Sequence, residues 1–312
     1  MSAGLRAGPL TREWNPPYPV DVRLVLSVHG RGRRDPAFAA DASGAVWRAV
    51  LTPDGPGTLR VPGLVAGPGT PLIASAWGPG AGWLLETLPA LLGEQDDPTG
   101  FAPVHPLLRE MAGRHPGFRV GQSGRVLEAL VPAVLEQKVV GAEARRAWHY
   151  LLRRFGSPAP GPAQPGMRVC PAAATWARIP SWEWHQAGVE PGQAVTIAGA
   201  ARVAGRLEEI VAMAAHDADR RLRSLPGIGP WTSAEVRQRA CGDADAVSVG
   251  DYHLPGAVGW ALAGRVVDDA GMLALLAPYA GHRYRAARLI ELSGVRPPRR
   301  GPRLAVREYR AF

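Results

Sequence analysis

The sequence contains almost no lysine: Lys138 is the only one, so 35 of the 36 basic residues are arginines. Cysteine is also scarce. Cys170 and Cys241 are too few for a four-thiolate iron–sulfur cluster or a structural zinc site. No run approaches the roughly 18 consecutive apolar residues of a membrane-spanning helix. Any chemistry that needs a lysine amine therefore has a single candidate in the chain.

The chain carries a strong positive charge, with a formal net charge of +9 and an isoelectric point of about 10.4. Phosphate contacts supply most of the affinity of proteins for nucleic acids, so this balance favours a polyanionic partner, nucleic acid above all. Genomic base composition is an equally good explanation for the choice of arginine over lysine. The opening residues lack the apolar core of a signal peptide, and we expect a cytoplasmic protein, associated with the nucleoid if it binds DNA.

The first part of the chain has the pattern of an antiparallel sheet. Between Pro19 and Gly78, four strand-like segments are each bounded by Gly, Pro or Asp: VDVRLVLSV, AVWRAVLT, GTLRVP and PLIASAWG. A helix is predicted in GWLLETLPALLG, and the polar segment GEQDDPTGFAP (residues 93–103) has the composition of a linker. The length of 312 residues suggests two domains. We predict that residues 1–98 form the sheet domain.

From about His105 to Ser293 apolar residues recur at helical spacing. The run from Ser123 to Gly156 begins with a serine suited to capping, and Pro132 inside it predicts a kink or a break. Further helices are predicted near residues 172–178, 194–215, 232–241, 254–263 and 282–292. We assign residues 99–295 to an all-α domain and residues 296–312 to a basic tail. The predicted fold class is α+β.

The stretch LPGIGPW, Leu225 to Trp231, places two glycines between predicted helices. Pro230 suits the first turn of the second helix. Glycines without Cβ let backbone amides approach a phosphate, and the helix adds the positive end of its dipole. Ile228 would anchor the turn in the core. A short glycine turn is also a common plain connector, and the turn alone leaves both readings open.

The following residues make the pattern more specific. Gly-Asp-Ala-Asp-Ala (242–246) and then Asp251 follow the turn, with Asp251 22 residues after Gly229 (251 − 229). Together with AVLEQKVVGAEARRAWHYLLRRFG and PYAGHRYRAARLIEL, this pattern resembles the helix-hairpin-helix DNA glycosylase superfamily, most of all its 3-methyladenine (alkylpurine) branch. The resemblance covers residues 104–292. Asp243 and Asp245, earlier in the loop, are interpreted as turn formers.

The resemblance implies an enzyme that flips a damaged nucleotide out of double-stranded DNA and hydrolyses its N-glycosidic bond, starting base-excision repair. Alkylated purines such as 3-methyladenine would be the substrates. Breaking this bond builds positive charge on the sugar, and the resemblance implies that the Asp251 carboxylate stabilises that charge. The simpler alternative is that Asp251 only caps a helix that starts near Tyr252.

The resemblance also implies the subclass. Bifunctional glycosylase/lyases of this superfamily carry a Schiff-base lysine two residues after the second hairpin glycine, where this chain has Trp231. A monofunctional enzyme without lyase activity is therefore expected. Trp231 would line the pocket and stack on the flipped base, although buried tryptophans are often plain core. Gln137 and Lys138 match the segment that is inserted into DNA, or they face solvent as ordinary helix residues.

The implied pocket contains two acids where alkylpurine members tend to have aromatics, Glu235 and Glu291, which could pair with a cationic base or point into solvent. Tyr252 keeps an aromatic nearby. Arg283, Arg285 and Arg288 are candidate phosphate contacts or solvated surface. The implied pocket residues are Trp231, Glu235, Tyr252 and Glu291. The implied DNA contacts are Leu225, Gly227, Ile228, Gly229, Trp231, Thr232, Gln137, Lys138 and Arg283.

No metal and no cofactor is implied, apart from a monovalent cation that would bridge the hairpin carbonyls and a DNA phosphate. We expect a monomer that binds damaged double-stranded DNA and no membrane. Two alternatives remain: a DNA-binding module that has kept the hairpin and lost catalysis, and a glycosylase for a deaminated or oxidised base. The acids at the pocket positions motivate the first of these.

Overall fold

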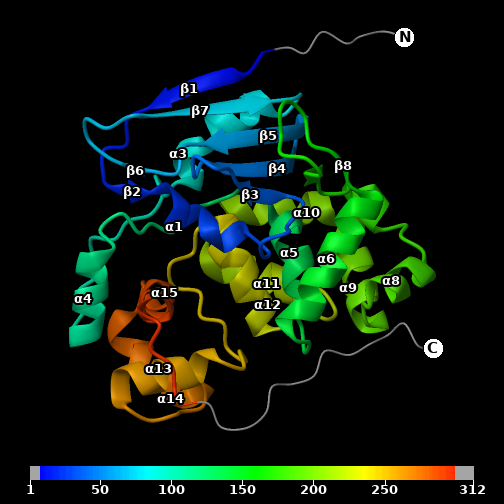
Figure 1. The fold of residues 1–312 in the computed structure, drawn as a ribbon. Helices are drawn as coiled ribbons and strands as arrows, with labels where there is room; N and C mark the ends of the chain where they lie inside the picture. Colours follow the sequence, from blue (N-terminus) through cyan, green and yellow to red (C-terminus); the bar gives the residue numbers. More distant parts are fainter. Residues whose placement is uncertain (1–7, 299–312) are drawn as a thin grey trace, which may run out of the picture.

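The computed structural model describes residues 8–298 and combines an antiparallel sheet with a larger set of helices (Figure 1). Residues 1–7 and most of the predicted basic tail, residues 299–312, lie outside the described part of the chain. The sheet occupies the top of the view in Figure 1 and the helices lie below it. In residues 8–298, no helix combines the length and the apolar character needed to cross a membrane.

The five-stranded sheet has the order β1-β7-β5-β4-β3, and all neighbours are antiparallel. Helices α2 (Ala81–Glu86) and α3 (Leu88–Leu91) pack on it, and their leucines share a core with the buried faces of the strands. A two-stranded ribbon pairs β2 with β6. The strands are β1 (Leu10–Trp14), β2 (Val20–Asp21), β3 (Phe38–Ala40), β4 (Val46–Thr52), β5 (Gly55–Val61), β6 (Val65–Ala66) and β7 (Leu72–Trp77).

The strand predicted for VDVRLVLSV is wrong beyond its first two residues. After β2 the chain forms α1 (Val22–Leu26) and then a 3₁₀ turn, η1 (Ser27–His29). The Asp21 carboxylate accepts a hydrogen bond from the Leu24 amide at 3.0 Å and so caps the helix. The buried residues Val22, Val25 and Leu26 also have helical spacing, which overrides the β-branched composition.

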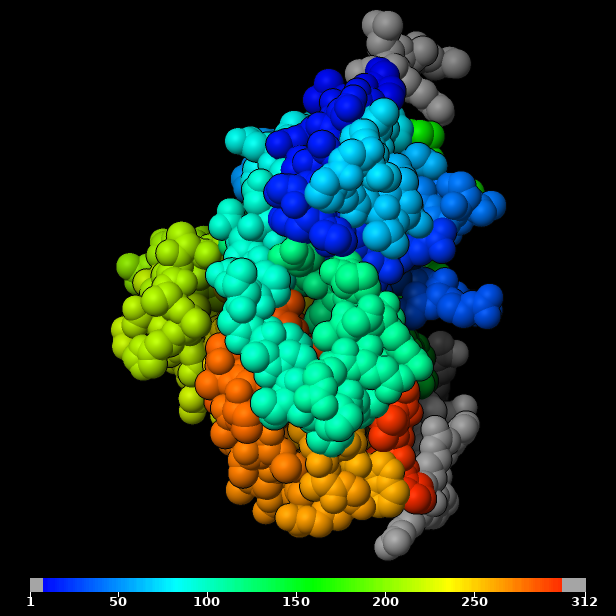
Figure 2. Space-filling model, turned by 90° about the vertical axis from the view of Figure 1, so that its left-hand side faces the viewer, coloured from blue at the N-terminus to red at the C-terminus, as the bar shows by residue number. Residues whose placement is uncertain are grey.

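The helical part has two cores. One surrounds α5, and the other is formed where α4, α13, α14 and α15 pack together, at the lower left of Figure 1 and the bottom of Figure 2. A small ribbon of two strands also lies within this part of the chain and packs on β4. The elements are α4 (Pro106–Arg114), α5 (Val126–Leu135), α6 (Gly141–Phe155), β8 (Ser157–Pro158), β9 (Arg168–Val169), α7 (Ala173–Trp176), α8 (Ser181–Ala187), α9 (Pro191–Arg202), α10 (Ala204–Glu208), η2 (Glu209–Ala212), α11 (Ala215–Arg223), α12 (Pro230–Val236), η3 (Arg237–Cys241), α13 (Leu254–Ala263), α14 (Asp269–Leu276), η4 (Ala277–Tyr279) and α15 (Arg283–Ser293).

Helix α5 differs from its prediction at both ends. Pro132 lies inside the helix without ending it, and the break comes at residues 136–140. Ser123 is not the cap, because the helix begins three residues later at Val126. The Glu208 carboxylate accepts hydrogen bonds from the amides of Val126 and Leu127, at 2.8 and 3.1 Å. A distant side chain therefore supplies the cap that the local sequence seemed to offer.

Candidate active site

The glycine turn joins α11 to α12 and lies at the surface. Gly227 has a left-handed φ of +84°, and a Cβ there would lie 2.1 Å from Thr196 Oγ1, so only glycine fits. Ile228 is 6% exposed and packs into the core around α5, which confirms its predicted anchoring role. The Ile228 amide donates to the Leu225 carbonyl at 3.1 Å. One buried side chain thus holds an otherwise exposed backbone corner.

The amides at this corner are free. In residues 8–298, the N–H groups of Gly227 and Gly229 donate to no acceptor. Gly229 has an ordinary extended backbone, φ −95° and ψ −177°, and a Cβ built on it would meet nothing within 4 Å. The fold itself therefore does not require a glycine at position 229. A partner that approaches the backbone closely is a physical reason for one.

Gln137 braces the hairpin from the loop between α5 and α6. Its side-chain amide donates to the Gly227 carbonyl at 2.9 Å and to Thr232 Oγ1 at 2.8 Å. Thr232 is 2% exposed, so its hydroxyl serves this internal bond. Lys138, the next residue, is exposed and is the one non-glycine residue of the described chain with a positive φ, +56°. The loop turns Gln137 inward and leaves Lys138 in solvent.

Asp251 lies between the hairpin helix and α13. Its Oδ1 accepts hydrogen bonds from the amides of His253 (2.7 Å) and Leu254 (2.8 Å), at the start of α13. Its Oδ2 accepts one from the indole N–H of Trp231 at 3.1 Å. Three N–H donors stabilise the negative charge and fix the orientation of the carboxylate. The capping role considered for Asp251 is real, and it leaves Oδ2 at the cavity.

A cavity of about 330 Å³ lies beside this carboxylate. Its lining includes four residues singled out from the sequence: Trp231, Glu235, Asp251 and Glu291. Tyr252 is not part of the lining; it is 84% exposed and its ring packs edge-on against His253, with centroids 4.8 Å apart. This corrects the expectation that Tyr252 lines the pocket. The tight turn that aims Asp251 inward sends its neighbour outward.

Tyr284 is an aromatic of the cavity that sequence reasoning missed. It stands seven residues before Glu291 on α15, hence on the same helical face, and this spacing could have identified it. Burial raises the pKa of Tyr284. Its hydroxyl has no hydrogen-bond partner in residues 8–298, although Trp231 across the same cavity has one. The cavity thus contains one free hydroxyl group that could bind a ligand.

Three arginine–glutamate pairs line the same cavity. Glu235 pairs with Arg239 at 2.7 Å and also accepts from the Ser248 hydroxyl at 2.6 Å. Burial works against the charge of Arg239, but the Glu235 carboxylate raises the pKa of Arg239 overall. The other two pairs are Arg31–Glu136 at 3.6 Å and Arg288–Glu291 at 2.9 Å. Glu235 and Glu291 therefore point into the cavity, with their charges already partly balanced.

The segment after α1 supplies one wall of the cavity. Ser27, Val28, Gly30 and Arg31 line it, far in sequence from the hairpin and from Asp251. The Val28 carbonyl accepts a hydrogen bond from Arg239 Nε at 3.0 Å and ties this wall to η3. No local pattern in the sequence indicated these residues, because the contact exists only in the tertiary structure.

Comparison with known proteins gives a clear answer on the fold. No family model and no curated protein matches the chain. A solved 3-methyladenine DNA glycosylase from Archaeoglobus fulgidus superposes with a TM-score of 0.72 at 16% identity, covering 91% of this chain and 98% of that one. This chain has the same fold as that solved glycosylase.

Two further structures with this glycosylase fold are similar. An 8-oxoguanine glycosylase/lyase from Clostridium acetobutylicum, solved with double-stranded DNA, has a TM-score of 0.66 at 10% identity and covers 91% of this chain and 96% of that one. A 3-methyladenine DNA glycosylase from Schizosaccharomyces pombe, solved with abasic DNA, has a TM-score of 0.51 at 16% identity, covering 63% and 94%. At these identities the likeness concerns the fold.

The three arginines of α15 have internal partners in this glycosylase fold. The Arg283 guanidinium donates two hydrogen bonds to the Asp245 carboxylate, which raises the pKa of Arg283. Arg285 is 3% exposed and is paired with the buried Asp96, so it is not a phosphate contact. Arg288 lines the cavity. The expectation of a phosphate contact is therefore wrong for Arg285. The charge of Arg283 is already paired with Asp245.

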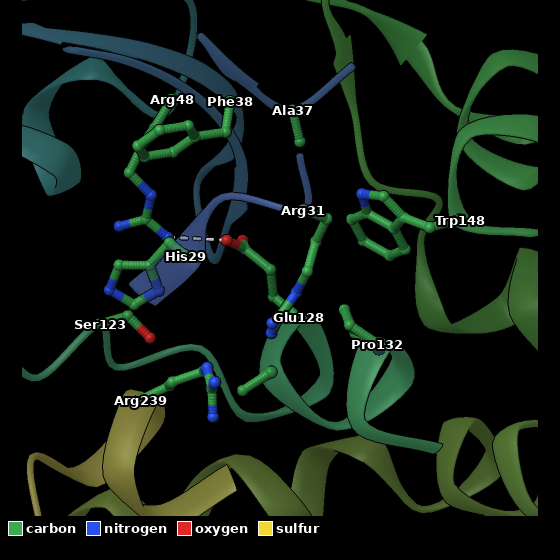
Figure 3. A pocket seen from close by; sticks show the side chains of 11 residues that line it. His29, Arg31, Ala37, Phe38, Arg48, Ser123, Glu128, Pro132, Trp148 and Arg239 are labelled. Carbon is green, nitrogen blue, oxygen red and sulfur yellow. Dashed lines mark hydrogen bonds and ion pairs between the residues drawn. The ribbon is translucent and has the colours of Figure 1, made fainter. Parts of the chain in front are cut away.

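A second, much smaller cavity of about 20 Å³ lies between the sheet and the helices (Figure 3). Arg31 and Arg239 line both cavities and form the partition between them. The buried Nε2 of His29 and Oε2 of Glu128 have no partner in the described residues, and the space is enough for about one water molecule. Burial, with Arg48 and Arg239 nearby, holds the pKa of His29 well below its usual value.

Proposed function

We propose that this protein is a monofunctional DNA N-glycosylase that hydrolyses the N-glycosidic bond of a damaged base in double-stranded DNA and so starts base-excision repair. One observation carries the proposal. Trp231 stands two residues after Gly229, at the start of α12, directly after the turn with the free amides. Its indole donates a hydrogen bond to the Asp251 carboxylate at the cavity. The hairpin turn and the Asp251 carboxylate are thus linked through Trp231 at the start of α12.

The chemistry assigned to Asp251 follows from its contacts. Loss of the base leaves oxocarbenium-like positive charge on the deoxyribose, and a fixed carboxylate beside the sugar lowers the energy of that state. Two backbone amides and the Trp231 indole hold the carboxylate in one orientation before the reaction. A water molecule then adds to the sugar, and the product is an abasic site.

The absence of lyase chemistry is also part of the proposal. Trp231 occupies the position at which bifunctional enzymes of the resembled superfamily carry a Schiff-base lysine. Lys138 is exposed on the α5–α6 loop and does not line the cavity. The loop that carries Lys138 is instead proposed to lie against the gap left by the flipped base, with the ammonium group at the flanking phosphates. Gln137 serves this role indirectly, because its hydrogen bonds to the hairpin hold the loop in place.

Alkylated purines such as 3-methyladenine are the first candidate substrates. The Archaeoglobus fulgidus structure with this fold is a 3-methyladenine DNA glycosylase. Trp231 and Tyr284 offer aromatic surface to an electron-poor, positively charged base, a contact worth about 0.5–2 kcal/mol. The carboxylates of Glu235 and Glu291 add negative potential to the same lining.

A second substrate class is favoured by the three arginine–glutamate pairs. A guanidinium donates hydrogen bonds to a carbonyl oxygen, and the adjacent carboxylate accepts one from a ring N–H. A neutral deaminated or oxidised base presents both groups side by side. Because Glu235 and Glu291 are balanced by Arg239 and Arg288, they offer less attraction to a cation than two unpaired acids would.

The deciding experiment is mass-spectrometric identification of the bases released from duplex DNA that has been alkylated, deaminated or oxidised. Asp251→Asn should release base at least about 100-fold more slowly than the wild type. Borohydride should trap no covalent protein–DNA adduct. Equal activity of Asp251→Asn would remove the role assigned to Asp251, and binding to abasic DNA without release from any lesion would show a binding protein that is not an enzyme.

A further inference from the structure

We propose that a strip of four unpaired cations, Arg33, Arg34, Arg145 and Lys138, is a second contact surface for the DNA sugar–phosphate backbone, separate from the hairpin. This inference rests on the proposed function, because it places the same duplex on both surfaces. Two of the four residues come from the loop after α1, in the motif GRGRRDP (residues 30–36), which the hairpin pattern does not include.

The loop is held rigidly at its base. Asp35 is 6% exposed; its Oδ2 accepts from the Arg31 amide at 2.7 Å, and its Oδ1 accepts from the Ala37 amide and from the Trp148 indole, both at 2.9 Å. Arg33 and Arg34 lie exposed just before this anchor. Because the loop backbone is already ordered, binding a partner requires ordering of the side chains alone.

Arg145 on α6 continues the strip. Its aliphatic stem lies against Gly32, where an added Cβ would be 2.8 Å from Arg145 Cδ. Its guanidinium lies beside Gly141 at the start of α6, where an added Cβ would be 3.0 Å from Nη1. Gly141 is three residues after Lys138. The loop after α1, α6 and the α5–α6 loop therefore bring the four cations into one neighbourhood.

The charges of the strip are free. All four residues are exposed, and in residues 8–298 none of them has a carboxylate within 4.0 Å. The arginines around the cavity are different, since Arg31, Arg239 and Arg288 each face a glutamate. An uncompensated cation at the surface attracts a phosphate without first having to break an internal pair.

The position of the strip fits a duplex held at the hairpin. Gln137, adjacent to Lys138, hydrogen-bonds the hairpin carbonyl of Gly227. At the other end, Gly30 and Arg31 line the cavity and lead directly into Arg33 and Arg34. The strip thus extends from the α5–α6 loop beside the hairpin to the loop after α1, whose first residues line the cavity. A backbone that leaves the hairpin amides would meet cations on its way across the site.

The test compares the salt dependence of DNA binding. Each phosphate contact contributes about 0.9 to the slope of log K against log salt concentration. The variant Arg33→Ala/Arg34→Ala should lower the slope by up to about 1.8, and Arg145→Ala by up to about 0.9, on a duplex with an abasic-site analogue measured by fluorescence anisotropy. The matched control is Arg178→Ala/Arg265→Ala, which removes two exposed arginines that follow α7 and α13 in the chain. This control should keep the wild-type slope.

Thermal unfolding midpoints equal to that of the wild type confirm that the variants fold. A wild-type slope for both strip variants overturns the strip, and so does an equal drop for the control, which would indicate only overall charge. The two proposals fail separately. Base release with unchanged slopes would contradict the strip alone. Lowered slopes without any base release would contradict the proposed enzyme activity and leave the strip as a DNA-binding surface.

Discussion

Asp251 combines helix-capping contacts with a position at the cavity. One oxygen accepts the first amides of α13, as a capping residue does, and the other faces the indole of Trp231 at the cavity. The capping contacts remove rotational freedom from the carboxylate and supply hydrogen-bond donors, which suits the catalytic role proposed for Asp251. Capping alone does not account for the hydrogen bond from Trp231, which stands two residues after the second hairpin glycine.

At the same scale, Arg285 gives a stability prediction. Its guanidinium and the Asp96 carboxylate are both almost fully buried, at 3% and 1% side-chain exposure. Arg285→Met leaves Asp96 as a buried charge without its partner, and the free energy of unfolding should fall by about 3–5 kcal/mol. Urea unfolding of the variant and the wild type measures this difference.

The double variant Arg285→Met/Asp96→Asn is the control for the buried charge. It should recover part of the lost stability, because the uncompensated carboxylate is gone. A single variant as stable as the wild type would contradict the stabilising role of the pair.

At the scale of elements, the hairpin separates two glycines that look alike in the sequence. Gly227 is required by the fold, because its φ is +84° and Thr196 leaves no room for a Cβ. Gly229 has space around it and an ordinary backbone. The physical reasons for the two glycines therefore differ, and substitution can tell them apart.

Gly229→Ala should fold with a stability within about 0.5 kcal/mol of the wild type, since the change meets no other atom. It should nevertheless weaken DNA binding for every DNA sequence, because the methyl group occupies space that a phosphate needs. Anisotropy titrations with two unrelated duplexes measure this effect.

Gly227→Ala is the contrasting variant. It should lose about 1–2 kcal/mol from the left-handed backbone alone, before the clash with Thr196 is added. If Gly229→Ala binds DNA as tightly as the wild type, the hairpin amides do not contact the backbone, and the glycine at 229 has another explanation.

Helix α5 illustrates what local sequence cannot supply. Ser123 is a good capping residue three positions before the helix, but the Glu208 carboxylate from α10 takes that role from 82 residues away. The following loop turns at Lys138 with a positive φ and a side-chain brace from Gln137. Capping propensity favours the nearest suitable residue in the sequence, whereas tertiary packing decides which side chain reaches the free amides of the helix.

At the scale of the whole molecule, His29 links the sheet to the helices and gives a pH prediction. Its pKa is held well below the ordinary value of 6.5 by burial and nearby arginines. Below about pH 6.5 the unfolded chain takes up a proton that the folded chain does not, so stability falls as the pH falls. Between pH 7 and pH 5 this group accounts for up to about 2 kcal/mol.

His29→Gln should lose less stability than the wild type over that pH range, as measured by urea unfolding at both pH values. His149 and His282 also have lowered pKa values and are unchanged in the variant, so they act as an internal reference. Parallel losses in variant and wild type would mean that His29 does not titrate in the folded-to-unfolded transition.

The sequence by itself determined the class of architecture and the hairpin. Alternating apolar residues predicted most of the antiparallel sheet, the helical spacing predicted α13 at its observed bounds, and the glycine turn with Ile228 predicted an exposed, anchored corner. These features depend on short-range sterics and on the periodicity of apolar residues, and both are local. The candidate catalytic carboxylate, Asp251, was implied by the resemblance to the helix-hairpin-helix glycosylases, on the residues that follow the glycine turn.

Only the tertiary structure decided what surrounds that carboxylate. The wall from Ser27 to Arg31, the aromatic ring of Tyr284, the outward turn of Tyr252 and the pairing of each cavity glutamate with an arginine all depend on segments distant in the sequence. Side-chain direction and charge pairing are set by which surfaces pack together. A linear pattern can name the residues of a pocket, but their neighbours across it are fixed by the folded chain.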